Sequence, residues 1–257
     1  MFLFWLGMII FTEDAYSRTQ EEVGHLRKKS FLRQCAVNLA LAFIILSIYF
    51  ITTDPSAQSI IARISTSPTF RGDVPLPGVG LMCQFEGEAD ELLSFGSACK
   101  EGGLTITFFV SAGFAERNQE ALYTVGNQGH SVELYGNGNL SYEEMEAYLE
   151  QGKHNVAQAT GREPVLFLPL RGEYSRGAMA AAQRMGMVPV LWSMDVRDSE
   201  AIHEEYAQEI AERSQSGELI LIPQDLRFEA SAEQIAQYLK ARQLETLPAS
   251  SLIRIAN

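Results

Sequence analysis

The residue types that build most catalytic and metal sites are sparse in this sequence. Histidine occurs only four times, as His25, His130, His154 and His203. Metal-binding histidines usually come as closely spaced groups, whereas these four are widely separated. The most loop-like stretch that follows an apolar run, Gly-Asn-Gly-Asn at positions 136–139, contains no histidine, cysteine or acid. We therefore expect no metal ligand set and no metal cofactor.

Carboxylates are abundant, and the chain carries a net charge of −12 at pH 7. Glu86, Glu88, Glu133, Glu173 and Asp195 could gather at one rim and bind a cation. An acidic chain places carboxylates over its whole surface, so we favour a solvated surface for these five. The same charge repels a phosphate backbone, which excludes nucleic acid as a partner.

Three groups have both a structural and a functional interpretation. His130 begins an apolar run, and we favour an imidazole hydrogen-bonded within the fold over a catalytic one. Trp192 precedes a polar turn, and we favour core packing, although a tryptophan at a site mouth can also stack on a sugar ring. Cys83 and Cys99 can pair if the fold brings them together, but we favour two buried thiols because no CxxC spacing occurs.

The elements that would position these groups alternate between strands and helices. Short apolar runs, each followed by a helical pattern, predict parallel strands joined by right-handed helical crossovers. The strands are expected at residues 80–85, 104–110, 130–135, 165–170, 187–194, 218–223 and 245–247, and the helices at residues 88–100, 115–125, 141–160, 175–186, 204–215 and 231–243. Seven strands favour a small barrel.

The helix expected at residues 141–160 has the clearest boundaries. Ser141 followed by Glu144 is a capping box, and Gly161 ends the helix. In parallel α/β folds the functional groups gather at the carboxyl ends of the strands. The loops that would form a site are residues 84–90, 135–140, 169–174, 195–198 and 223–225.

Several motifs together resemble the polysaccharide deacetylases of the NodB-homology type, carbohydrate esterase family 4. They are GH followed by a polar loop and SYEE at residues 129–144, TG at 160–161, PxxGEY at 169–174, LWSxDxRD at 191–198 and GELILIP at 217–223. The resemblance covers residues 80–253. It implies a distorted (β/α)7 barrel and, in active members, metal-dependent removal of acetyl groups from N-acetylated sugars.

The resemblance also implies where the metal ligands of an active member would lie. Active members begin with TFDDGP, where one aspartate is the general base and the next a metal ligand. The matching segment here is QFEGEA, which places Glu86 at the base and Gly87 at the ligand. The two histidines of the HTxxH pattern fall on Tyr135 and Asn139. The implied metal ligands are therefore absent from this sequence.

The remaining family positions have changed as well. The arginine of the RPPYG motif falls on Leu168, and the general-acid histidine falls on Pro223. Arg171 lies three residues beyond the usual arginine. Asp195 and Asp198 are the candidates for the aspartate that orients this arginine, and an ion pair between Asp195 and Arg171 is one possible replacement.

An N-terminal membrane anchor is expected before this domain. Residues 35–51 read CAVNLALAFIILSIYFI, an uncharged run close to the shortest length that spans a bilayer. Basic residues precede the run at positions 27–29 and 33, and none follows until Arg63, so the positive-inside rule places the later residues outside the membrane. An alternative start at Val23 would leave a short signal anchor.

The sequence thus predicts four regions: a cytoplasmic segment (1–34), a single transmembrane anchor (35–51), a stalk rich in Ser, Thr and Pro (52–78) and an extracytoplasmic NodB-like domain (79–257). Each boundary follows from the change in composition along the chain.

Three hypotheses for function follow. The first is a domain that has lost metal-dependent deacetylation and binds a glycan or a protein partner, with Tyr135, Asn139 and Trp192 as candidate substrate-binding residues. The second is a divergent deacetylase of peptidoglycan or another N-acetylated polymer, whose rebuilt site uses Glu86, Asp195 and Arg171. The third is a purely structural role in a cell-envelope complex.

Overall fold

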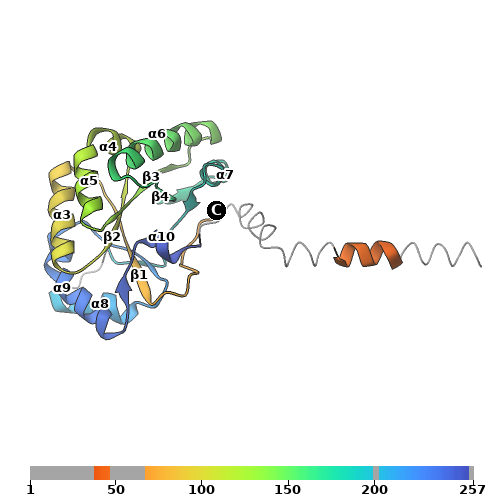
Figure 1. Ribbon diagram of the computed structural model, residues 1–257. Coiled ribbons are helices and arrows are strands. Elements are labelled where there is room, and N and C mark those ends of the chain that lie inside the picture. Colours follow the sequence, from red (N-terminus) through yellow and green to blue (C-terminus); the bar gives the residue numbers. More distant parts are fainter. Residues whose placement is uncertain (1–37, 47–66, 199–202, 255–257) are drawn as a thin grey trace, which may run out of the picture. The chain divides into compact units, whose positions relative to one another are not determined.

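The computed structural model of the protein describes residues 38–46, 67–198 and 203–254. The chain divides into one unit of residues 1–62 and a second of residues 63–257. In the first unit, residues 38–46 form a helix with exposed side chains (Figure 1). The rest of the predicted anchor and the segment 1–34 lie outside the described residues. No helix within the described part of the chain is long and apolar enough to cross a membrane.

The second unit alternates strands with helices, as the sequence predicts. Its elements are β1 (Gly78–Gln84), α3 (Ala89–Glu101), β2 (Ile106–Val110), α4 (Ala112–Arg117), α5 (Gln119–Asn127), β3 (Ser131–Gly138), α6 (Tyr142–Thr160), β4 (Leu166–Tyr174), α7 (Arg176–Arg184), β5 (Val188–Pro189), β6 (Met194–Asp195), α8 (His203–Arg213), β7 (Leu219–Leu221), α9 (Leu226–Ala241), β8 (Glu245–Thr246) and α10 (Ala249–Leu252).

The strands form a parallel sheet that curves into an open half-barrel. Their order is β5-β4-β3-β2-β1-β7-β6, and β8 pairs with the start of β1. This half-barrel is consistent with the distorted (β/α)7 barrel that the resemblance implies, and within the described residues it stays open between β5 and β6, because the run at residues 187–194 splits into two short strands. One half, β5, pairs with β4 and the other, β6, pairs with β7 at the far edge.

Residues 69–72 of the predicted stalk pair with the chain next to β5 and next to β7. Thr69 pairs with Val190, which follows β5, and Arg71 pairs with Glu218, which precedes β7. Gly72 N–H also donates to the Gly217 carbonyl at 2.7 Å. Backbone groups at the open edges are thereby partly satisfied, as buried strand edges require.

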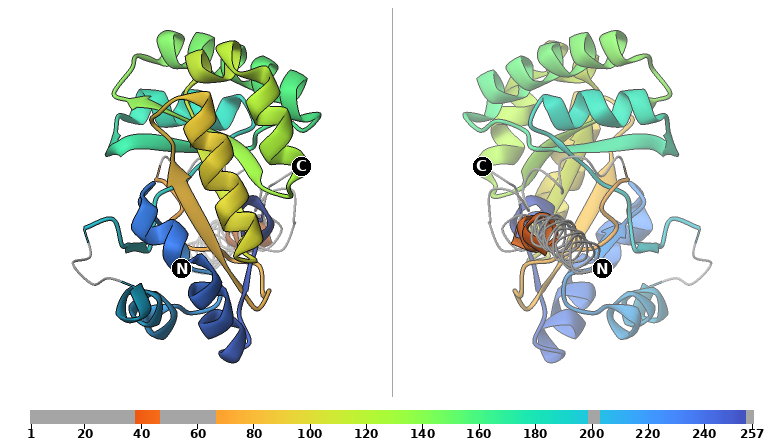
Figure 2. Two further views of the ribbon diagram at one scale, coloured as in Figure 1. Left: turned by 90° about the vertical axis from the view of Figure 1, so that its left-hand side faces the viewer. Right: turned by 90° about the vertical axis from the view of Figure 1, so that its right-hand side faces the viewer.

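The strands are buried on both faces, as expected for a parallel sheet. Helices α3 to α6 cover one face, which the left view of Figure 2 shows from the helical side (Figures 1 and 2). Leu81, Phe108 and Leu134 belong to the large core between sheet and helices. Met82 and Phe109 point to the other face, where α10 contributes Ala249 and Leu252 to a smaller inner core.

Local capping explains where the helices begin and end. Ser141 and Glu144 form the predicted capping box of α6, and Gly161 ends this helix with a left-handed φ of 70°. Helix α9 begins at Leu226, earlier than predicted, because the Asp225 carboxylate accepts a hydrogen bond from the Phe228 N–H at 2.8 Å. Most of the predicted elements are therefore confirmed, with boundaries shifted by caps.

His130 and the two described cysteines lie inside the fold. His130 Nδ1 accepts a hydrogen bond from the Ile106 N–H at 3.1 Å, and Nε2 donates to the Gly96 carbonyl at 2.9 Å. Burial lowers the pKa of this imidazole. Cys83 and Cys99 are buried free thiols. The structural interpretation of His130 and the expectation of two unpaired thiols are both confirmed.

Glu133 is not on a solvated surface, contrary to the expectation from the sequence. It is buried, and one carboxylate oxygen accepts hydrogen bonds from the Val165 and Leu166 N–H groups at 2.7 and 2.8 Å. The Ser131 hydroxyl lies 3.4 Å from the other oxygen. Burial raises the pKa of Glu133 to about 8 even though these bonds oppose the shift. Glu133 therefore joins β3 to the start of β4.

The raised pKa of Glu133 predicts a pH dependence of stability. The folded state holds this proton more tightly than the unfolded state, whose ordinary pKa is 4.5. Binding of this proton stabilises the folded state. The free energy of unfolding should therefore decrease as the pH rises from about 4.5 to about 8. Urea unfolding at several pH values in this range measures this decrease. The unfolding free energy should change less with pH in Glu133→Gln than in the original chain, because glutamine keeps an acceptor but does not titrate.

A second variant separates titration from hydrogen bonding. Glu133→Ala leaves the Val165 and Leu166 amides without their acceptor, and each lost partner should cost about 1–3 kcal/mol of unfolding free energy. Equal stability of the Gln and Ala variants at all pH values would contradict the proposed link between the strands.

Candidate functional site

The carboxyl ends of the strands form a polar mouth around Glu86, Gln84 and Tyr135. Gln84, the last residue of β1, donates through Nε2 to Glu86 Oε1 at 2.6 Å. Burial raises the pKa of Tyr135 to about 12, and the nearby Glu86 charge adds to this shift. Glu86 is exposed, whereas Tyr135 is half-buried. The structure thus brings a predicted catalytic candidate and a predicted substrate-binding candidate together.

A second group at the mouth comes from the loops around β6. The Asp195 carboxylate accepts hydrogen bonds from Arg197 Nε at 3.0 Å and from its terminal nitrogen at 2.7 Å. Partial burial opposes ionisation of Asp195, but the bonds and charge of Arg197 outweigh it and lower the Asp195 pKa. The Arg197 guanidinium also lies over the Trp192 ring, 5.3 Å from its centroid. Trp192 otherwise packs against the inner core.

Arg171 does not take the place suggested by the sequence. Its side chain is exposed, and its backbone adopts a left-handed φ of 56°. Asp195 pairs with Arg197 instead of Arg171, because Arg197 follows on the same turn and its own N–H also bonds to Asp195 at 3.1 Å. The suggested Asp195–Arg171 ion pair is therefore wrong. Arg171 remains at the rim. The backbone of the next residue, Gly172, packs against the Trp192 ring.

The glycine and asparagine loop is a close-packed end of β3 rather than a free turn. Ser175 N–H donates to the Gly138 carbonyl at 2.7 Å. Asn139 Nδ2 donates to Glu173 Oε2 at 3.3 Å. A methyl group on Gly138 would lie 2.0 Å from the Glu173 carbonyl oxygen. The loop is thus fixed to β4, and Asn139 stands on the rim with Glu173.

Tyr148 of α6 packs against this end of β3. Its hydroxyl donates to the Tyr135 carbonyl and accepts from the Ala112 N–H at 3.0 Å. The Tyr148 ring lies so close to Gly136 that a Cβ there would be 2.7 Å from a ring carbon. A glycine is needed at position 136 for this approach.

The side chains at the implied metal positions do not fit a divalent metal. Gly87 has no donor atom, and a Cβ placed there would lie 2.2 Å from Glu91 Oε2. The Asn139 amide donates a hydrogen bond to the Glu173 carboxylate. Tyr135 supplies only a phenol, and its raised pKa keeps this group protonated. Within the described residues, no three His, Cys, Asp or Glu side chains are grouped closely enough to hold a metal ion.

Pro223 lies where the resemblance implies the general acid, and the polar groups beyond it form hydrogen bonds within the protein. Arg227 donates to the Asp225 carboxylate at 3.3 Å and lies over the Tyr206 ring, 4.6 Å from its centroid. Tyr206 is fully buried, and its hydroxyl has no hydrogen-bond partner in the described part of the chain. Of this group, the sequence predicts only Asp225 near the site, within the loop at residues 223–225. Only Asp225, a capping residue before an apolar helix, carries a sequence signal for it.

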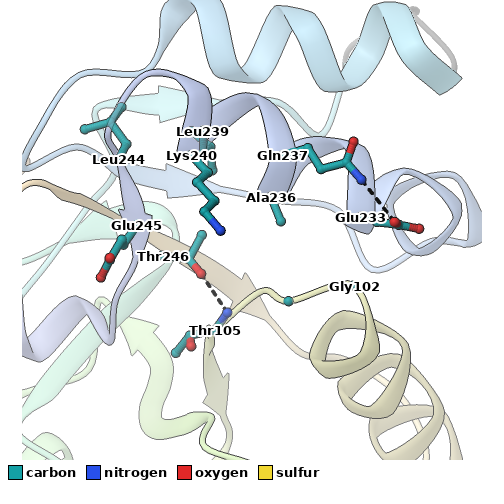
Figure 3. Close-up of a pocket in the computed structure, with 11 residues that line it drawn as sticks. Gly102, Thr105, Glu233, Ala236, Gln237, Leu239, Lys240, Leu244, Glu245 and Thr246 are labelled. Carbon is teal, nitrogen blue, oxygen red and sulfur yellow. Dashed lines mark hydrogen bonds between the residues drawn. The ribbon is translucent and has the colours of Figure 1, made fainter.

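A pocket of about 530 Å³ lies at the other end of the strands (Figure 3). It is lined by Lys240 and Gln237 of α9, by Thr105 before β2 and by Thr246 of β8. The Thr105 N–H donates to Thr246 Oγ1 at 2.8 Å, as Figure 3 shows. Because parallel α/β folds place their functional groups at the carboxyl ends, the mouth remains the candidate site.

Tight packing at Gly138 predicts a large effect of a small substitution. Gly138→Ala should lower the free energy of unfolding by about 1–3 kcal/mol or more, because the methyl group meets a backbone oxygen that cannot easily move. Gly126→Ala is the control, because a Cβ at this helical glycine would lie 3.7 Å from its nearest neighbours, the side-chain carbons of Thr160. This variant should be stabilised by about 0.5–1 kcal/mol. Urea unfolding of both variants tests the expectation.

The Asp195–Arg197 pair predicts a modest effect on stability. The two side chains are partly exposed, so Asp195→Asn should cost about 1 kcal/mol or less. Arg171→Ala should change the unfolding free energy by less than about 0.5 kcal/mol, because its side chain is exposed. A larger loss in Arg171→Ala than in Asp195→Asn would contradict the observed pairing.

Comparison with known proteins agrees with the observed fold. Residues 95–190 match the family model described as polysaccharide deacetylase. No curated protein matches the sequence. A pseudoenzyme of carbohydrate esterase family 4 from Bacillus anthracis has a similar structure, with a TM-score of 0.65 and 18% identity over 74% of this chain and 70% of that one. A mutant of this pseudoenzyme with restored enzymatic activity is equally similar.

Two further solved structures are similar. A peptidoglycan N-acetylglucosamine deacetylase has a TM-score of 0.64 and 18% identity, over 73% of this chain and 93% of that one. A family 4 carbohydrate esterase from Streptomyces lividans, in complex with acetate, has a TM-score of 0.58 and 22% identity, over 66% of this chain and 91% of that one. These likenesses establish the fold. Together with the family match, they confirm the resemblance of this chain to the NodB-type polysaccharide deacetylases of carbohydrate esterase family 4.

Proposed function

We propose that this chain is a deacetylase-like protein of the cell envelope that binds a glycan at its mouth and has lost metal-dependent deacetylation. The observation that carries the proposal is the state of the implied metal positions. Gly87 has no ligand atom, and the Asn139 amide is engaged with Glu173. The base, ligand and acid positions of the family have changed together.

The size of the chemical loss supports this proposal. A catalytic metal lowers the pKa of bound water from roughly 15.7 to roughly 7, so its loss removes about eight orders of magnitude of hydroxide at neutral pH. Glu86 is exposed and bonded to Gln84, and a single carboxylate does not replace that effect. Hydrolysis would therefore need another source of nucleophile.

The mouth keeps groups that suit sugar recognition. Gln84, Glu86, Glu173 and Asn139 offer amide and carboxylate oxygens that can accept bonds from hydroxyl groups. The Trp192 ring packs near the backbone of Gly172, with the Arg197 guanidinium over it, and an aromatic ring can also contact a sugar. One structural neighbour acts on peptidoglycan N-acetylglucosamine, which makes a cell-wall glycan the first ligand class to test.

The membrane anchor belongs to this proposal. Residues 35–51 are apolar and uncharged, and basic residues precede them. We expect the full chain to remain with membranes after washing with high salt and alkali, and to be extracted by detergent. Protease added outside intact cells should remove the C-terminal domain. A chain recovered in the soluble fraction would contradict the anchor without bearing on glycan binding.

The main test measures acetate release and glycan binding by the same detergent-solubilised full chain. With zinc or cobalt added, we expect no acetate from N-acetylglucosamine oligomers above the level of Glu86→Gln. We also expect saturable oligomer binding that weakens roughly ten-fold when Tyr135 and Asn139 are both changed to alanine. Acetate release that requires Glu86 would establish the alternative, a divergent deacetylase. Unchanged binding in the double variant would remove the mouth as the glycan site.

Restoring the implied ligands tests the assignment of positions. Gly87→Asp, Tyr135→His and Asn139→His in one chain should create a zinc site, visible as a zinc-dependent rise in Tm that the original chain lacks. The introduced aspartate must displace the Glu91 carboxylate, so the metal-free variant should also lose about 1 kcal/mol of stability. A variant that folds but binds no zinc would show that the ligand positions have been assigned incorrectly.

A further inference from the structure

The segment shortly before β1, residues 67–74, pairs with the chain that leads to Trp192, and we call this segment the strap. We propose that the strap is a positioning segment of the mouth, which holds Trp192 and the Asp195–Arg197 pair where a glycan binds. This inference rests on the proposed function, because it assumes that the mouth binds a glycan. It goes beyond that function by giving a part of the predicted stalk a role in binding.

The chain through β5 and β6 crosses from one edge of the half-barrel to the other. The Val190 N–H donates to the Phe167 carbonyl of β4 at 2.8 Å. The Ser193 N–H donates to the Leu219 carbonyl of β7 at 2.9 Å. Between these two contacts lies Trp192, where the chain has left β4 and is about to join β7. The position of Trp192 therefore depends on what holds the middle of this crossing.

The strap supplies the contact in the middle of the crossing. The Thr69 N–H donates to the Pro189 carbonyl at 2.8 Å, and the Leu191 N–H donates to the Thr69 carbonyl, also at 2.8 Å. Leu191 is buried against the inner core, so its backbone N–H needs a partner within the protein. The next residue is Trp192. One residue of the strap thus fixes the chain on the approach to the mouth.

The other end of the strap is fixed independently of the crossing. The Arg71 guanidinium donates to the Ser216 carbonyl, shortly before β7, at 3.1 Å. The Asp73 and Val74 N–H groups donate to the Leu252 carbonyl of α10 at 2.9 and 3.0 Å. Since α10 belongs to the inner core, these contacts tie the strap to a rigid part of the fold. The strap is therefore a support for the crossing rather than a segment that follows it.

Trp192 transmits the position of the crossing to the mouth. A Cβ at Gly172 would lie 3.3 Å from the Trp192 ring, and the Arg197 guanidinium lies 5.3 Å from the ring centroid on its way to Asp195. A displaced ring would loosen both contacts at once. Binding sites need their contacting groups held within about 0.5 Å of the productive geometry. Release of the crossing from the strap should therefore weaken glycan binding.

The first test removes one backbone donor of the strap. Thr69→Pro deletes the N–H that donates to the Pro189 carbonyl, and Thr69→Ala is the matched control because alanine keeps this N–H. Both changes are made in the full chain with Trp5→Phe, which leaves Trp192 as the single tryptophan. In detergent, Thr69→Pro should bind N-acetylglucosamine oligomers about two- to ten-fold more weakly, the effect of one hydrogen bond. Its Trp192 fluorescence should move to longer wavelength, in protein that remains folded by circular dichroism.

The second measurement uses the unchanged chain, so its outcome does not depend on the folding of Thr69→Pro. If an ordered strap favours glycan binding, a bound glycan must order the strap by the same factor. Hydrogen exchange of the Thr69 and Leu191 amides should therefore slow about two- to ten-fold when the oligomer is bound. The Thr105 amide, which bonds to Thr246 Oγ1 at the other end of the strands, should exchange at an unchanged rate.

The remaining outcomes separate this inference from the proposed function. Thr69→Pro that binds as tightly as Thr69→Ala, or binds more weakly with unchanged Trp192 fluorescence, would overturn the role of the strap and leave glycan binding in place. Exchange of the Thr69 and Leu191 amides that is insensitive to the oligomer would do the same. Absence of oligomer binding in the unchanged chain would overturn the proposed function itself, and this inference with it.

Discussion

The alternation of side chains along the parallel strands decides what can reach the mouth. Every second residue of β1, β2 and β3 faces the helices and is apolar, so these strands are anchored by burial on that side. The residues between them face the inside of the half-barrel and include Gln84, Glu133 and Tyr135. A shift of one residue in any strand would exchange the two sets, so the core fixes which polar groups lie at the mouth.

This constraint also explains which features could be predicted from the sequence. The order of the elements and the caps of α6 follow from local patterns, namely apolar runs, Ser141 with Glu144, and Gly161. The splitting of the run at residues 187–194 could not be predicted, because both of its halves are apolar and their separation depends on pairing with different strands. The burial of Glu133 was not predicted for a related reason. Its carboxylate is satisfied only by the N–H groups of Val165 and Leu166, which lie beside it once β3 and β4 have paired.

The mouth itself was predicted in part. Glu86, Tyr135 and Asp195 lie near the carboxyl ends of β1, β3 and β6, as expected from the strand pattern, and Trp192 lies between β5 and β6. The pairing among them was not predicted, because the sequence offers Asp195 both Arg197 and the more distant Arg171, and only backbone geometry distinguishes them. Arg197 lies on the same turn as Asp195, whereas the left-handed backbone at Arg171 leaves that side chain exposed. Sequence spacing identifies the groups, and local conformation decides which of them neutralise each other.

The rewritten site and the stability of the fold are linked through one atom. Glu91 Oε2 accepts the Glu88 N–H at 3.1 Å, as part of the capping box that begins α3. The same atom lies 2.2 Å from where a Cβ at position 87 would stand. A side chain at position 87 and this cap therefore compete for the same space. Because an N-cap contributes about 1 kcal/mol, the glycine at position 87 leaves the cap of α3 intact at the position where the family resemblance implies a metal ligand.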